Sequence, residues 1–425
     1  MTIKERFLNA IKRGTGEAHL LMKANPKLDF SNAIIKAAKK NLSYDPQSEG
    51  SRAEYVFELI QLSDKKEKIR KAILNSLATE REDTWALEQL FDLAALFANQ
   101  GDKKAKKAIY KRYLKKTIQG SDWAGEDALI AIDGIEGLKY IAEAKGKIIN
   151  KYPDGWELSW RVDDFQENNP TINVYEELKK ASGKNKYIKV YLSAILKNKT
   201  GFQKPESPRC NYEIVTDKIK SMRIVPLWPS GAIELSKKDI KKLADDFLIQ
   251  TVRLKLEKYM RVFNLVKYPY DYQPILKLAK SKYNRKDRLP EFSCGALKYF
   301  SGTDIRKFAI EILNKTNNPA DYLDLLVLNY KKRDHEMLTS IVNKTKLEYK
   351  VHALVWGYIN IYNANPTKEC VPPLTALYDK LTCGLHRTDI VKIMIDNNVL
   401  PDRILEEIKH DSYPATRNLL KTRKS

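Results

Sequence analysis

The chain has 425 residues, which is long enough for two or three ordinary domains or for one extended repeat array. Hydrophobic residues make up 43% of it, which excludes a wholly disordered chain, and the formal net charge of +22 favours polyanionic partners such as nucleic acid. No apolar run approaches the roughly 20 residues that span a bilayer, and the four cysteines are widely spaced. We therefore expect a cytoplasmic protein with no membrane partner and no disulfide framework.

The basic residues are mostly lysine. Lysine makes point-charge contacts with phosphate, whereas arginine is preferred for bidentate reading of bases. The composition therefore favours binding to the nucleic-acid backbone, of DNA or RNA, over sequence-specific recognition. The alternative interpretation is that the lysines reflect the base composition of the genome.

Helical periodicity dominates the first 152 residues and predicts an N-terminal helical lobe. Residues 1–21 form an amphipathic pattern, without the apolar core of a signal peptide, and "GTG" at 14–16 is predicted to be a turn flanking a helix. Further helices are predicted over residues 51–62, 83–100, 106–118 and 125–149.

The middle of the chain, residues 153–235, departs from this pattern. Proline, glycine and tryptophan cluster there, which predicts an irregular segment with short helices that is either a functional insertion or a connection between domains. "RIVPLW" at 223–228 is the best strand candidate, although proline interrupts it. Helical patterns return over 236–425 and predict a C-terminal helical lobe.

Several helix starts repeat along the chain. Asp64 and Asp102 open similar segments 38 residues apart, and Asp64 precedes Arg70 by the same six residues that separate Asp411 from Arg417. With looser matches at 303–313 and 388–397, these features resemble HEAT repeats. In that family the Asp and Arg help stack helical hairpins into a right-handed solenoid. The resemblance implies an all-α, right-handed α-solenoid around an irregular middle insertion; the alternative is a non-repeating helical bundle.

The strongest concentration of charge is the segment "GDKKAKKAIYKRYLKK" at 101–116. From Lys103 to Ser121 the chain has no acid, although Glu–Lys pairs one turn apart normally stabilise a solvated helix face. We predict that this strip docks on nucleic-acid phosphates, the alternative being a plain solvated face. Its predicted contact residues are Lys103, Lys104, Lys107, Lys111, Arg112 and Lys115.

Two more basic strips follow, one free of acids over 178–205 and one at 277–288. On a curved solenoid the three strips are expected to line one concave groove, where several phosphates are neutralised together. Their predicted contact residues are Lys184, Lys186, Lys189, Lys282, Arg285 and Lys286. The alternative partner is a protein held in the same groove by a HEAT-repeat scaffold.

No phosphate-binding loop, dinucleotide fingerprint, zinc-protease motif or nucleophile elbow occurs, so binding is favoured over catalysis and no cofactor is expected. Cys383 and His386 form C-x-x-H, with Cys370 before and His410 after, but the spacing matches no zinc finger and no metal site is predicted.

The one enzymatic hypothesis starts from "SDWAGEDALIAIDG". Trp123 and Asp127 are four residues apart, hence on one helix face, and resemble the Trp/Asp arrangement of HEAT-like alkylpurine DNA glycosylases. The resemblance implies that Asp127 assists the loss of a cationic base while Trp123 contacts the nucleotide. Trp85 and Trp156 are candidates for a second tryptophan, and the sequence fixes no supporting arginine. The alternative makes Trp123 a core residue and Asp127 a first-turn acid that favours the helix dipole.

Overall fold

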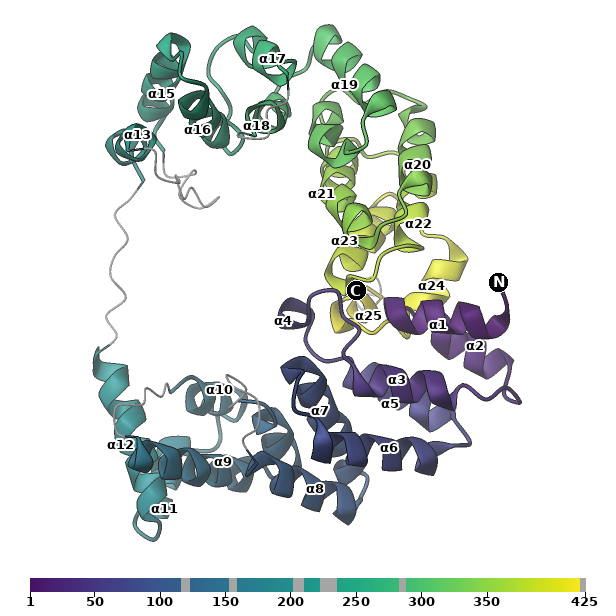
Figure 1. The fold of residues 1–425 in the computed structure, drawn as a ribbon, viewed down its shortest axis with the longest axis vertical. Helices are drawn as coiled ribbons and strands as arrows, with labels where there is room; N and C mark the ends of the chain where they lie inside the picture. Colours follow the sequence, from purple (N-terminus) through teal and green to yellow (C-terminus); the bar gives the residue numbers. More distant parts are fainter. Residues whose placement is uncertain (116–122, 153–158, 202–209, 222–234, 283–287, 421–425) are drawn as a thin grey trace. The chain divides into compact units, whose positions relative to one another are not determined.

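The computed structural model describes residues 1–115, 123–152, 159–201, 210–221, 235–282 and 288–420, and these residues form helices and connections without a strand (Figure 1). The chain divides into two compact units. Unit 1 comprises Met1–Pro205, Thr382–Gly384 and Glu406–Ser425, and unit 2 comprises Glu206–Leu381 and Leu385–Leu405. The all-α prediction is confirmed for the described residues.

The helices of unit 1 are α1 (Ile3–Arg13), α2 (Glu17–Ala24), α3 (Ser31–Lys39), α4 (Pro46–Glu49), α5 (Ala53–Leu62), α6 (Lys66–Thr79), α7 (Thr84–Asn99), α8 (Lys103–Tyr113), α9 (Glu126–Lys151), α10 (Trp160–Asn168), α11 (Val174–Ser182), α12 (Lys186–Gly201) and α25 (Pro414–Asn418).

The helices of unit 2 are α13 (Tyr212–Lys220), α15 (Lys237–Ile249), α16 (Arg253–Phe263), α17 (Gln273–Ala279), α18 (Leu289–Leu297), α19 (Thr303–Lys315), η1 (Pro319–Leu326), α20 (Asp334–Lys344), α21 (Glu348–Ala364), η2 (Lys368–Cys370) and α22 (Val371–Tyr378). Two further helices, α23 (Gly384–Asp396) and α24 (Asp402–Ile408), cross the unit boundaries.

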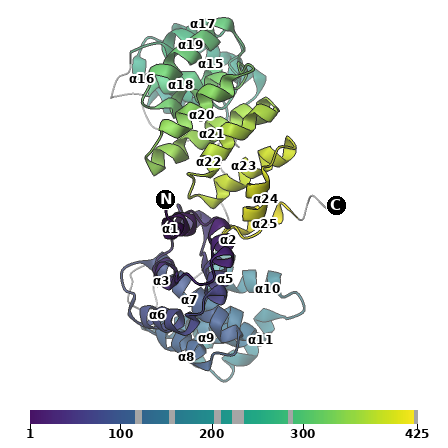
Figure 2. The same cartoon turned by 90° about the vertical axis from the view of Figure 1, so that its right-hand side faces the viewer.

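Unit 1 has two neighbouring hydrophobic cores. The first extends from Phe7 to Ile141 over α1 to α9, in which α3, α5, α6 and α7 pack against one another (Figure 2). The second joins α9 to α10, α11 and α12. Helix α9 contributes residues to both cores, and its direction breaks at Gly134, where φ is 54° and ψ is −125°. This positive φ favours glycine, so the single helix predicted over 125–149 is two helical segments.

The N-terminal turn of unit 1 packs closely on its C-terminal segment. The backbone N–H of Ser412 donates to the carbonyl of Gly14 at 2.7 Å. A Cβ atom at Gly16 would lie 1.9 Å from the carbonyl oxygen of Glu407, so a side chain there is excluded. "GTG" at 14–16 is thus a turn between helices, as predicted, and its second glycine also permits this close approach.

Unit 2 is built from consecutive helices that pack pairwise, among them α16 and α17 on α18, α20 on α22, and η1 on α18, α19 and α21. Aromatic rings pack edge to face in part of its interior, for example those of Phe263 and Tyr268, whose centroids lie 4.9 Å apart. Lys380 caps the end of α20, since its ammonium donates to the carbonyls of Val342, Asn343 and Thr345 at 2.6–3.0 Å.

The unit boundaries differ from the predicted division at 152 and 235. Residues 159–201 of the predicted middle segment form α10, α11 and α12, which share a core with α9. The strand candidate at 223–228 lies outside the described residues. In the described part of the chain, no helix combines the length and apolarity required of a membrane span.

Candidate functional site

The lysine-rich segment forms α8, and one face of this helix is entirely basic. Asp102 caps the helix, because its carboxylate accepts from the backbone N–H groups of Lys104 at 2.9 Å and Ala105 at 3.1 Å. Ala105 and Ile109 are buried against neighbouring helices. The lysines of the opposite face, Lys103, Lys104, Lys107 and Lys111, are all exposed, and so is Lys115 just beyond the end of the helix. Within the described residues none of these five lysines forms an ion pair with a carboxylate.

Several helical lysines elsewhere in the protein are paired with acids one turn away. Lys147 lies 2.6 Å from Glu143, and Lys315 lies 2.9 Å from Glu311. Such pairs stabilise a helix by a few tenths of a kcal/mol, and like charges at the same spacing destabilise it by similar amounts. The basic face of α8 therefore has an electrostatic cost that a polyanion would remove.

The tyrosines of α8 belong to its contact with α9. The hydroxyl of Tyr110 donates to Asp133, which also pairs with Lys106 at 2.6 Å. The ring of Tyr110 meets that of Tyr140 edge to face, with centroids 4.7 Å apart. Tyr110 is therefore a packing residue and does not offer a free ring for base stacking.

Arg112 differs from the other predicted contact residues because it is buried, with 5% of its surface exposed. Its guanidinium donates to the carbonyls of Leu77 at 2.9 Å and Glu80 at 2.8 Å, at the end of α6, and to that of Lys115. These acceptors occupy the donors that a phosphate would need, so Arg112 holds α6 and α8 together and leaves the interface to the lysines.

The other basic strips are divided between the units. Lys184, Lys186 and Lys189 are exposed in unit 1, around the turn from α11 to α12. Lys282 is exposed in unit 2, while Arg285 and Lys286 lie outside the described residues.

A second site surrounds the predicted Trp/Asp pair of unit 1. The rings of Trp123 and Trp85 lie with centroids 5.3 Å apart, which brings one candidate for the second tryptophan to the first; Trp156 lies outside the described residues. Asp127 is in the first turn of α9, as expected, and its side chain is 60% exposed. Its carboxylate pairs with the guanidinium of Arg161 from α10.

Arg161 also belongs to a buried network. Its Nε donates at 2.9 Å to Glu126, whose side chain is wholly buried, and Lys145 pairs with the other oxygen of Glu126 at 2.9 Å. The same guanidinium also packs on an aromatic ring, since the guanidinium carbon of Arg161 lies 4.1 Å from the ring centroid of the exposed Trp160. Two cations thus hold Glu126, and Arg161 extends the network to Asp127 at the surface.

Two carboxylates of α7 lie close to this network and are shifted toward their neutral forms. Burial, followed by the charge of Asp92, raises the pKa of Glu88 well above its ordinary value, although Glu88 accepts a 2.8 Å hydrogen bond from the backbone of Gly125. Burial also raises the pKa of Asp92 to about 6; the charges of Asp127 and Glu54 act in the same direction.

Carboxyl groups of unequal acidity beside an aromatic pair are suited to proton transfer or to stabilising positive charge. Arg161, Glu88 and Asp92 are members of this site that were not predicted from the sequence. Glu88 and Asp92 are one turn apart on a mostly apolar helix, a pattern from which the sequence could have indicated them. No comparable sequence pattern indicated Arg161, because it lies in the segment 157–167, whose composition resembles that of an acidic solvated loop.

The adjacent acids of that segment do not act together. Asp163 accepts hydrogen bonds from Ser159 at 2.6 Å and Tyr175 at 2.7 Å, whereas Asp164 faces Asn168 at 3.3 Å. Consecutive helical residues point in different directions, so these carboxylates form no joint site.

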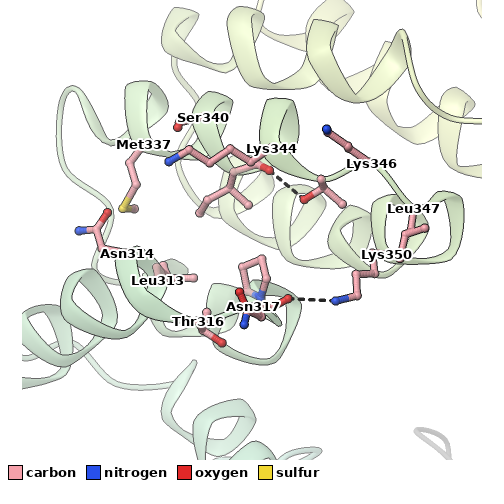
Figure 3. Close-up of a pocket in the computed structure, with 13 residues that line it drawn as sticks. Leu313, Asn314, Thr316, Asn317, Met337, Ser340, Lys344, Lys346, Leu347 and Lys350 are labelled. Carbon is pink, nitrogen blue, oxygen red and sulfur yellow. Dashed lines mark hydrogen bonds between the residues drawn. The ribbon is translucent and has the colours of Figure 1, made fainter.

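Unit 2 contains an open pocket of about 590 Å³ between α19, α20 and the start of α21 (Figure 3). Lys344, Lys346 and Lys350 line it together with polar and apolar side chains. Lys350 is partly engaged, since its ammonium donates to the carbonyl of Asn317 at 3.3 Å. The pocket holds no acid and no buried polar group directed into it, so we assign it no chemistry.

Comparison with known proteins finds no protein-family model that matches the chain, and neither a curated protein nor a solved structure that is similar to it.

Proposed function

We propose that this protein binds nucleic acid, DNA or RNA, through contacts between the phosphate backbone and the exposed lysines of α8. The proposal rests on one observation, that four lysines share one face of α8, that Lys115 follows just beyond its end, and that none of the five pairs with a described carboxylate. Phosphates would neutralise this face and release counterions. The exposed Lys184, Lys186 and Lys189 are the next candidates for contact. We place this binding in the cytoplasm.

We also propose that the helices are organised as HEAT-like repeats in a right-handed solenoid. Arg70 of α6 pairs with Asp102, which caps α8, and Arg306 of α19 pairs with Asp334 at 2.7 Å at the start of α20. In each case one helical element lies between the two that are paired, and Arg–Asp pairs of this kind agree with the stacking role that the HEAT resemblance implies. They recur at separations of 32 and 28 residues.

The test is a salt series of binding to labelled duplex DNA, single-stranded DNA and structured RNA. The variant replaces Lys104, Lys107, Lys111 and Lys115 with alanine. A matched control makes the same change in charge at four lysines that are paired with acids and lie outside the three basic strips: Lys147, Lys315, Lys392 and Lys409. For duplex DNA, the log–log salt slope should fall by about 0.9 per lost phosphate contact, hence by about 3 to 4, in the first variant only.

Equal slopes in the two variants, or no binding at about 50 mM salt, would refute the proposal. The rival hypothesis, a protein-binding scaffold, would then be favoured. It predicts a partner protein whose binding survives high salt and does not respond to the lysines of α8.

A second candidate function is the release of alkylated bases from DNA. It is favoured by the joint presence of Trp85 beside Trp123 and of Arg161 on Asp127, the two partners that the glycosylase resemblance requires. In such a reaction the bond from the sugar C1′ to the base nitrogen breaks, a cationic base leaves as a neutral molecule, and water adds to C1′ with loss of a proton. A carboxylate at Asp127 would stabilise the positive charge that develops on the sugar.

The test measures base release from DNA that carries N-methylated purines. Asp127→Asn should abolish release while leaving DNA affinity within about twofold, and Glu136→Gln, an exposed acid of the same helix, should leave both unchanged. No release by the unaltered protein would reject this function without affecting the backbone-binding proposal.

A further inference from the structure

Two histidines and a glutamate from three segments of unit 1 meet near its N-terminal turn. His19 lies in α2, Glu58 lies in α5, and His410 follows α24. One potential ligand atom from each lies within 4.8 Å of the other two. The two imidazole rings are stacked, with centroids 3.6 Å apart and planes 9° from parallel.

His19 is the most buried of the three, with 7% of its surface exposed. Neither of its ring nitrogens has a hydrogen-bond partner among the described residues. Polar atoms buried in this way cost free energy unless they are satisfied, and most in native proteins have a partner. His410 and Glu58 are half-buried, so the cluster remains accessible from one side.

We propose that His19, Glu58 and His410 bind a divalent transition-metal ion of the zinc type. Imidazole nitrogens and a carboxylate oxygen are ordinary zinc ligands, and three protein ligands leave a fourth position for water or a further ligand. Zinc–nitrogen bonds are about 2.0–2.1 Å long and lie in the plane of the imidazole ring. The two stacked rings, whose planes are now 9° from parallel, would therefore have to rotate relative to one another for both nitrogens to bind one ion.

Arg417 is the competing partner of this site. Its Nη1 contacts one carboxylate oxygen of Glu58, while Nη2 lies 3.4 Å from the other, Oε2. Oε2 is thus the more weakly held oxygen and is the one we assign to the metal. The guanidinium can keep the first oxygen, which would orient the carboxylate as a hydrogen-bonded outer partner.

The bound ion would join the N-terminal helices of unit 1 to its C-terminal segment. The backbone already approaches closely there, through the Ser412–Gly14 hydrogen bond and the contact of Gly16 with Glu407. Ion binding to the folded form alone would raise the thermal stability of the unit.

The experiment titrates the metal-free full-length chain with Zn²⁺ in competition with a chromophoric chelator. The same samples are then loaded with Co²⁺ to record the visible bands of a four-coordinate ion. His19→Gln and His410→Gln are expected to weaken Zn²⁺ binding about tenfold or more, and to lose the Co²⁺ bands and the rise in melting temperature caused by zinc.

His335→Gln is the control, since it replaces a partly exposed histidine of unit 2 that lies outside the proposed site. It should bind Zn²⁺ as the unaltered chain does. If His19→Gln fails to fold, the half-buried His410→Gln decides the question. Absence of binding by the unaltered chain, or equal binding by His410→Gln, would overturn the proposal.

Discussion

Replacing Asp92 with asparagine tests the electrostatics of the site formed by Glu88, Asp92, Glu126 and Asp127, called the acidic site below. Burial raises the pKa of Asp92 from 3.8 to about 6. One pKa unit corresponds to about 1.4 kcal/mol, so the shift of about two units is worth at most about 3 kcal/mol. The pKa of Asp92 is higher in the folded chain than in the unfolded chain. The protonated carboxyl therefore contributes stability that is fully present below about pH 4, and this stability is lost as the pH rises through about 6.

Asparagine is neutral at every pH and can still accept a hydrogen bond from Ser51. We therefore expect Asp92→Asn to exceed the unaltered protein in free energy of unfolding by about 1–3 kcal/mol at about pH 7.5, and to match it near pH 4. The assay is urea unfolding followed by tryptophan fluorescence over this pH range. Asp64→Asn, at a 76% exposed side chain, is the control and should show no such trend. A variant that is less stable at about pH 7.5, or a difference independent of pH, would refute the reasoning.

Two further predictions concern the packing of unit 1. Gly16→Ala should lower the free energy of unfolding by about 1–3 kcal/mol, because its Cβ would collide with the carbonyl of Glu407. The control Gly183→Ala, where the nearest atom to the new Cβ lies at 3.4 Å, should be neutral or slightly stabilising. Equal free energies of unfolding for the two variants would contradict this prediction. Arg70→Ala should cost about 2 kcal/mol because it removes a two-point contact to a largely buried carboxylate. Asp102→Ala should cost more, since it also removes the cap of α8, and a double-mutant cycle should show less than additive losses.

The interface and the acidic site differ in how far the sequence predicted them. The acid-free run after Asp102 predicted the basic face of α8, because exposure on a helix follows from periodicity alone. The same periodicity did not predict the burial of Arg112, which depends on carbonyls at the end of α6. Asp127 was proposed from its spacing to Trp123, and its role stays a prediction. Its partner Arg161 is 34 residues away on another helix.

The sequence by itself determined the helical class and most helix positions, since these depend on local amphipathic patterns and caps. The break of α9 at Gly134, the two compact units and the inclusion of α10 to α12 in the first were decided by tertiary packing. The same holds for His19 and His410, which lie at opposite ends of the chain and stack on one another. Spacing along the chain carries information only within one or two helical turns, whereas contacts between distant segments depend on how the helices pack.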